Sequence, residues 1–137
     1  MLDSRLRPLI DPPLNAIGKG LARAGITANQ VTIAGAVIGI GAGVAIGYHY
    51  YLLGLVLVLL SGVLDGLDGA VARVTKQSDF GGYLDIVSDF AFYVAVPLGF
   101  GFAASANLAF AMILIASFTL TGISFLAYAV MAAKAGR

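Results

Sequence analysis

The sequence predicts an all-α protein, a polytopic bundle of about four transmembrane helices preceded by an amphipathic helix at the membrane surface. Of the 137 residues, 60% are hydrophobic and 11% are charged, and the mean hydropathy is +0.96. A soluble domain is about a quarter charged. Four apolar stretches are also long enough to cross a bilayer, which takes about 20 residues. We therefore expect a single membrane domain over residues 1–137.

Residues 1–26 are expected to form a juxtamembrane segment. A helix is predicted to begin at residues 11–13 (DPP), because proline suits the first helical turn. Within residues 14–24 apolar side chains recur every three or four positions, while Lys19 and Arg23 fall on another face. This pattern is typical of an amphipathic helix that lies in the membrane interface. An ordinary solvated connector is the alternative.

Residues 27–137 are expected to form the transmembrane bundle. Thr27 suits the N-cap of the first span, because its hydroxyl can accept a hydrogen bond from the first helical turn. Four glycines recur at every fourth position of that span, and small residues at this spacing let helices approach closely in a membrane. The predicted spans are residues 27–48, 51–74, 82–104 and 108–133.

The basic residues predict the orientation of the bundle. Every lysine and arginine falls before the first span, in the turn between the second and third spans, or after the fourth span. Cytoplasmic loops are the ones enriched in these residues. We therefore expect a cell-membrane protein whose two termini and acidic motif lie on the cytoplasmic side. The basic residues are Arg5, Arg7, Lys19, Arg23, Arg73, Lys76, Lys134 and Arg137.

Five of the seven acidic residues lie within residues 65–89, where the second and third spans meet. Asp65 and Asp68 are three positions apart, so they share one face of a helix. Asp85 and Asp89 are four positions apart and share a face of the next helix. A short turn makes the two helices antiparallel neighbours. The two acidic pairs are therefore expected to meet across the helix interface.

Carboxylates near the membrane interior need compensation, since each uncompensated charge there costs several kcal/mol, on the order of 3. Arg73 is the one cation within the part of the motif on the second span, so a divalent cation is the expected counter-charge. Carboxylate oxygens suit Mg²⁺, Mn²⁺ or Ca²⁺, and Mg²⁺ commonly also binds a substrate phosphate. Arg73 can bind a phosphate as a planar fork. The alternative is that the acids are helix-end charges in water, and Asp79 is expected to be such a loop charge.

A family resemblance rests on these same residues. The pattern Asp65-x-x-Asp68-Gly69-x-x-Ala72-Arg73, followed by Gly81-x-x-x-Asp85-x-x-x-Asp89, resembles the signature of the CDP-alcohol phosphatidyltransferases. All eight signature residues are present. The stretch TANQVT before the first span also resembles the TPNxVT of that family, with Ala28 in place of proline.

The resemblance implies a membrane enzyme of six helices, usually a homodimer, that acts in phospholipid biosynthesis. Such an enzyme moves a phosphatidyl or related phospho-alcohol group from a CDP-linked lipid donor, such as CDP-diacylglycerol, to a small alcohol acceptor and releases CMP. The implied cofactor is Mg²⁺ or Mn²⁺. Its implied ligands are Asp65, Asp68, Asp85 and Asp89, of which Asp89 is also the general base. The residues implied to bind the CDP moiety are Gly69, Ala72, Arg73, Gly81, Asn29 and Thr32.

Both the completeness of the chain and its function stay open at this point. Because four spans are predicted where the family has six, the chain is expected to be a truncated form, a fragment, or a minimal variant completed by dimerisation. An inactive homologue that binds only metal and nucleotide is one alternative function, and a small cation transporter or channel is another. The net charge of +1 predicts no nucleic-acid partner. The acceptor is open among glycerol phosphate, inositol, inositol phosphate and serine, and the compact chain predicts a prokaryotic source.

Overall fold

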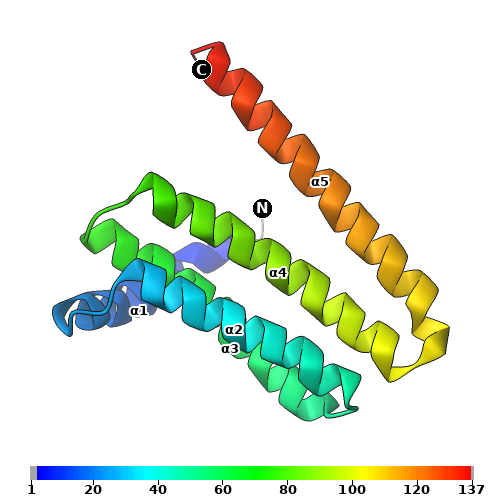
Figure 1. Cartoon of the computed structure of the whole chain (residues 1–137). Coiled ribbons are helices and arrows are strands. Elements are labelled where there is room, and N and C mark those ends of the chain that lie inside the picture. The colour runs from blue at the N-terminus through cyan, green and yellow to red at the C-terminus, as the bar shows by residue number, and fades with distance from the viewer. Residues whose placement is uncertain (1–2, 137) are drawn as a thin grey trace.

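The structure, a computed structural model, describes residues 3–136 and consists of helices joined by short turns (Figure 1). The all-α class is confirmed, and four of the described helices are long and apolar enough to cross a membrane. Arg137, one of the basic residues used to orient the bundle, lies outside the described residues. The helices are α1 (Asp3–Arg23), α2 (Ala28–Gly47), α3 (Tyr51–Val74), α4 (Asp79–Ala103) and α5 (Leu108–Lys134), with a 3₁₀ turn, η1, at Ser105–Asn107.

Helix α1 begins earlier than predicted. The prediction placed its start at residues 11–13, but the helix begins at Asp3 and continues through three prolines. Each proline removes one main-chain donor and can bend a helix without ending it, so the prolines mark no boundary here. The solvated-connector alternative is wrong, because Leu14 and Leu21 pack against the buried cluster around Val71. The position of α1 in the membrane interface stays a prediction.

Helix α2 begins as predicted, with Thr27 as its N-cap. The Thr27 hydroxyl accepts a hydrogen bond from the Gln30 amide at 3.2 Å, and the Gln30 side chain accepts one from the Thr27 amide at 3.0 Å. This reciprocal pair is a capping box, which satisfies two main-chain donors that a helix start otherwise leaves without partners. It fixes the point at which α2 enters the bundle.

The glycines of α2 lie where other helices approach closely, as the spacing predicts, with Gly35 against α3 and Gly43 against α4. A Cβ atom at Gly43 would collide with the main-chain carbonyl of Ala95, and one at Gly99 would collide with the carbonyl of Gly43. The two helices are therefore in backbone contact at this point, which only glycine permits. Figure 1 shows α2, α3 and α4 side by side, so α2 lies against both of the helices that bear the acidic motif.

Helix α4 begins at Asp79 and not at residue 82 as predicted. The Ser78 hydroxyl accepts a hydrogen bond from the Gly81 amide at 3.0 Å, so Ser78 is the N-cap and the helix starts one residue after it. The predicted loop position of Asp79 is therefore wrong, because it is the first residue of α4, although it is an exposed charge at a helix end. A negative charge in the first turn is favourable, since it faces the positive end of the helix dipole.

Helix α5 contacts the rest of the protein along α4 and diverges from it toward its C-terminal end (Figure 1). The ring of Phe118 stacks on that of Tyr93 with centroids 4.9 Å apart. Only 6% of the apolar stretch of α5 is buried inside the protein, compared with 44% for α2. The exposed face of α5 is almost wholly apolar, which suits contact with lipid.

Candidate active site

Three carboxylates from α3 and α4 converge. Asp65, Asp68 and Asp85 each place one oxygen so that the three oxygens lie within 4.8 Å of one another. The predicted meeting of acidic residues from the two helices is confirmed for these three, although α3 and α4 each pack mainly on α2 and hardly on each other. Three carboxylate oxygens this close suit a hard divalent cation such as Mg²⁺ or Mn²⁺. The residues present thus fit a bound metal ion.

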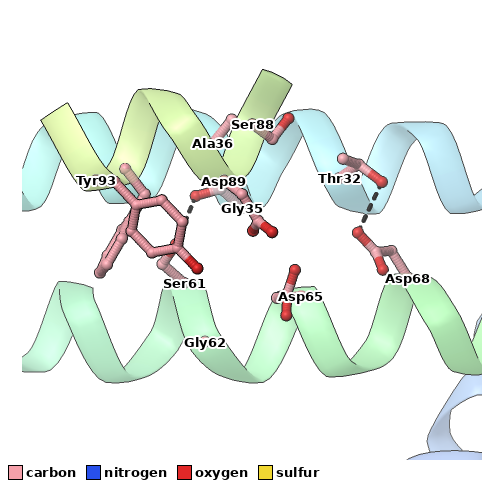
Figure 2. Close-up of a pocket in the computed structure, with 11 residues that line it drawn as sticks. Thr32, Gly35, Ala36, Ser61, Gly62, Asp65, Asp68, Ser88, Asp89 and Tyr93 are labelled. Carbon is pink, nitrogen blue, oxygen red and sulfur yellow. Dashed lines mark hydrogen bonds between the residues drawn. The ribbon is translucent and has the colours of Figure 1, made fainter. Parts of the chain in front are cut away.

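Asp68 is the most enclosed member of the cluster, with 7% of its surface exposed. It accepts a hydrogen bond on Oδ2 from the Thr32 hydroxyl of α2 at 2.7 Å (Figure 2). The bond ties α2 to α3 and fixes the rotation of the carboxyl group. Asp65, by contrast, is exposed.

Asp89 lies beside the cluster and is not one of the three converging carboxylates. Figure 2 shows Asp89 of α4 and Asp65 of α3 pointing toward one another across a cavity. This inner cavity, of about 150 Å³, lies between α2, α3 and α4. Its lining consists of Thr32, Gly35, Ala36, Ser61, Gly62, Asp65, Asp68, Ser88, Asp89, Phe92 and Tyr93.

A second cavity, the outer cavity, lies near the turn between α3 and α4 and has a volume of about 260 Å³. It contains five of the residues predicted to bind the CDP moiety, which are Asn29, Thr32, Gly69, Ala72 and Gly81. The rest of its lining is Ala28, Asp68, Lys76, Gln77, Ser78, Gly82 and Asp85. Thr32 and Asp68 line both cavities, so the carboxylate cluster lies where the two meet.

Arg73, the remaining residue predicted for the CDP moiety, lines neither cavity. Its Nη2 donates a hydrogen bond to Oδ1 of Asn15 at 2.9 Å. Its Nη1 lies 3.5 Å from the position that a Cβ atom would take at Gly69. The guanidinium group therefore lies at the edge of the outer cavity, between α1 and the glycine. Sequence reasoning missed Asn15, because nothing in the spacing relates two residues 58 positions apart.

Sequence reasoning also missed polar residues of the inner cavity. Ser61 lies four positions before Asp65, and Tyr93 lies four positions after Asp89. Residues four apart share a helix face, so the same spacing argument that pairs the aspartates could have found them. The Ser61 hydroxyl donates to the Gly35 carbonyl at 2.9 Å, which joins α3 to α2 one turn from the cluster.

The comparison with protein families identifies the chain. Residues 25–137 match the CDP-alcohol phosphatidyltransferase family. The chain belongs to this family. The predicted resemblance is thereby confirmed, and the matched region contains the acidic cluster and both cavities.

Two curated proteins show how this family member relates to others. It is 46% identical, over 135 residues, to the inner membrane protein YnjF of Escherichia coli, an alignment that covers 98% of the chain and 66% of the relative. It is 45% identical, over 91 residues, to the archaetidylinositol phosphate synthase of Pyrococcus horikoshii, covering 63% of the chain and 46% of the relative. The chain thus spans about two thirds of the first relative and under half of the second. No solved structure matches the chain.

These comparisons and the four apolar helices together support a prokaryotic membrane protein of a phospholipid-synthesis transferase family. One relative is bacterial and the other archaeal, and one is named an inner membrane protein.

Proposed function

We propose that the chain is an enzyme that transfers a phosphatidyl or related phospho-alcohol group from a CDP-linked lipid to an alcohol and releases CMP. The observation that carries the proposal is the position of the carboxylate cluster between the two cavities. The outer cavity contains the residues matched to nucleotide binding, and the inner cavity contains Asp89. Two substrates that react with each other would meet at the cluster.

The outer cavity takes the CDP moiety of the donor in this proposal. Gly69 and Ala72 keep one wall free of bulky side chains. A Cβ atom at Gly81 would lie 3.1 Å from the Ser78 hydroxyl and 3.2 Å from the Asn29 amide oxygen, so a larger residue there would intrude on both. Lys76, on the same lining, supplies a positive charge toward a diphosphate.

Asp65, Asp68 and Asp85 would hold Mg²⁺ or Mn²⁺, with Asp89 close by. When bound there, the ion would neutralise diphosphate charge and make CMP a better leaving group. Thr32 contributes by holding the Asp68 carboxyl group in place at 2.7 Å, which pre-arranges the ligand set.

Asp89 acts as the general base in the proposed step. It accepts the proton of the acceptor hydroxyl in the inner cavity, which makes that oxygen a better nucleophile. The oxygen forms a bond to the phosphorus that bears the lipid. The bond from this phosphorus to the bridging oxygen of CMP breaks, and the electron pair leaves with CMP. The products are the new phosphodiester and CMP, with the proton on Asp89.

A phosphorylated polyol such as inositol phosphate is the acceptor that we propose to test first. The name of the archaeal relative, an archaetidylinositol phosphate synthase, supports this choice. The identities of the donor and of the acceptor can both be determined by measuring CMP release.

The test measures CMP release from CDP-diacylglycerol by the purified chain in detergent with Mg²⁺ or Mn²⁺. Inositol phosphate, glycerol phosphate, inositol and serine are offered one at a time. We expect metal-dependent release with one acceptor, and at least a hundredfold loss in Asp89→Asn, since general bases contribute roughly 10² to 10⁴ in rate. Asp79→Asn, the same change at the start of α4, is the matched control and should keep its activity.

Other outcomes separate the alternatives. Metal-dependent CDP binding without CMP release would favour the inactive homologue. Cation flux through vesicles containing the chain, with neither binding nor release, would favour a transporter or channel. A homodimer, which the family resemblance implies, is tested by the mass of the detergent-solubilised chain.

The cytoplasmic orientation of the site is a proposal that rests on the basic residues. The chain has no cysteine, so single cysteines report sidedness cleanly. We expect Ala106→Cys, in the turn before α5, to react with a membrane-impermeant maleimide applied to spheroplasts. Gln77→Cys, in the turn before α4, should react only after lysis. The reverse pattern would place the site on the other side.

A further inference from the structure

Helix α1 packs directly on the part of α3 that carries the acidic motif. Gly18 is buried against α3, and a Cβ atom there would lie 2.7 Å from the Cβ atom of Ala70 and 3.0 Å from its carbonyl carbon. One turn away, Cδ1 of Leu14 lies 3.2 Å from the position of a Cβ atom at Gly66. Small residues on both helices therefore let α1 lie close to α3 beside the site.

This close approach brings Asn15 to Arg73. The Asn15 side-chain oxygen accepts a hydrogen bond from Nη2 of Arg73, which leaves Nη1 over Gly69 at the edge of the outer cavity. An amide oxygen is an uncharged acceptor. It orients the guanidinium plane while the full positive charge stays available for a phosphate, whereas a carboxylate at position 15 would neutralise that charge.

We propose that Asn15 is a positioning residue for Arg73, and that α1 is thereby part of the site for the donor nucleotide. The proposal rests on the proposed function, in which the outer cavity takes the CDP moiety, and it adds that Arg73, at the edge of that cavity, binds a phosphate of the CDP moiety. Arg73 is on the surface, and a free arginine side chain there samples many rotamers. The hydrogen bond from Asn15 restricts these rotamers before the nucleotide arrives, so less freedom is lost on binding.

A double-mutant cycle tests the pair. The dissociation constant for CDP is measured by titration calorimetry, with Mn²⁺ present, for the whole chain, Asn15→Ala, Arg73→Ala and the double variant. We expect Asn15→Ala to weaken CDP binding about three- to tenfold, the range of one hydrogen bond. In the Arg73→Ala background the same change should have no further effect, because Asn15 acts through Arg73. Asn107→Ala, the same substitution at the last residue of η1, is the control.

A second pair of variants tests α1 itself. Gly18→Ala adds a methyl group against the main chain of Ala70, so α1 must move away from α3. Gly20→Ala adds the same group where nothing lies within 4 Å. We expect Gly18→Ala to weaken CDP binding as Asn15→Ala does, and Gly20→Ala to bind like the original chain. Thermal unfolding in detergent confirms that each variant is folded.

Kinetics separate a positioning role from a general structural one. Asn15→Ala should raise the KM for the CDP-linked donor and leave kcat within about twofold, because Asn15 does not touch the reacting groups. An equal loss of CDP affinity in both backgrounds, or no loss in the original one, would overturn the inference while CMP release still supports the proposed function. A chain that neither binds CDP nor releases CMP would overturn the proposed function itself.

Discussion

The unit of α2, α3 and α4 and the single helix α5 are both apolar enough to cross a membrane, but their hydroxyl groups bond to different partners. In the three-helix unit, the Thr32 hydroxyl lies 3.0 Å from the Ala28 carbonyl of its own helix, but its shorter contact, 2.7 Å, is with the Asp68 carboxylate of α3. The Ser61 hydroxyl of α3 donates to the Gly35 carbonyl of α2. On α5, Ser117, Thr119 and Thr121 each donate to the carbonyl four residues earlier in α5 itself. Serine and threonine hydroxyls therefore link neighbouring helices in the three-helix unit, whereas on α5 they bond only to the main chain of their own helix.

This difference shows what makes a polar residue functional inside a membrane. The hydroxyls of the three-helix unit lie where glycine and alanine let the helices approach, so they fix carboxylates and line the cavities. Those of α5 lie on a helix that buries only Ala111 and Gly122 fully among its described residues. Hydroxyl composition alone cannot distinguish the two cases. The two cases are distinguished by whether small residues on neighbouring helices pack closely around the hydroxyl group.

The largest expected effect comes from breaking the contact between α2 and α4. Gly43→Ala places a methyl group against the main chain of Ala95, which cannot move away as a side chain could. We expect a loss of about 3 kcal/mol in the free energy of unfolding in detergent, at the upper end of typical overpacking costs. Gly41→Ala, which would meet only Cδ1 of Leu57 at 4.0 Å, is the control and should unfold like the original chain.

A smaller effect is expected from removing one hydroxyl in each region. Thr32→Val keeps the shape of the side chain but removes the hydrogen bond to Asp68, a loss of about 1 kcal/mol. We also expect Mn²⁺ binding, measured by calorimetry, to weaken several-fold because the Asp68 carboxyl is less fixed. Thr121→Val removes a hydroxyl that bonds only within α5 and should change neither quantity. If Thr32→Val and Thr121→Val changed the free energy of unfolding and Mn²⁺ binding equally, the hydroxyls of the two regions would not differ in role.

The smallest effect is expected on the exposed face of α5. Leu120 is 69% exposed, so Leu120→Ala should change the free energy of unfolding by less than about 0.5 kcal/mol. Leu67, 7% exposed, is the comparison, and Leu67→Ala should cost about 2 kcal/mol. A large loss at Leu120 in the detergent-solubilised chain would show that α5 packs against a further copy or segment.

Sequence reasoning predicted the fold where local signals are strong. The capping residue Thr27 marked the start of α2, and the predicted bounds of α3 agree with the structure. It failed at two helix starts. The prolines of residues 11–13 predict a first helical turn, but α1 begins at Asp3 and passes through them. At α4 the predicted start is residue 82, whereas the Ser78 cap begins the helix at Asp79.

The candidate site was predictable as far as helix faces go. Spacings of three and four residues predicted that the aspartates of α3 and α4 would meet, and three of them do. The position of Asp89 beside the cluster depends on how α3 and α4 are each rotated about their own axes in the bundle. The sequence spacing of the aspartates does not define these rotations. The Asn15 and Arg73 pair depends on the docking of α1 through Gly18, a tertiary contact with no local signature.

The caps of α2 and α4 have a consequence for the electric field of the outer cavity. Both helices begin at its lining, α2 at Ala28 and α4 one residue after Ser78. The start of an α-helix behaves as about half a positive charge, since its first amides are not paired within the helix. Two such ends make the cavity attractive to a diphosphate independently of Lys76. That attraction belongs to the main chain, so no single side-chain substitution in the lining abolishes it.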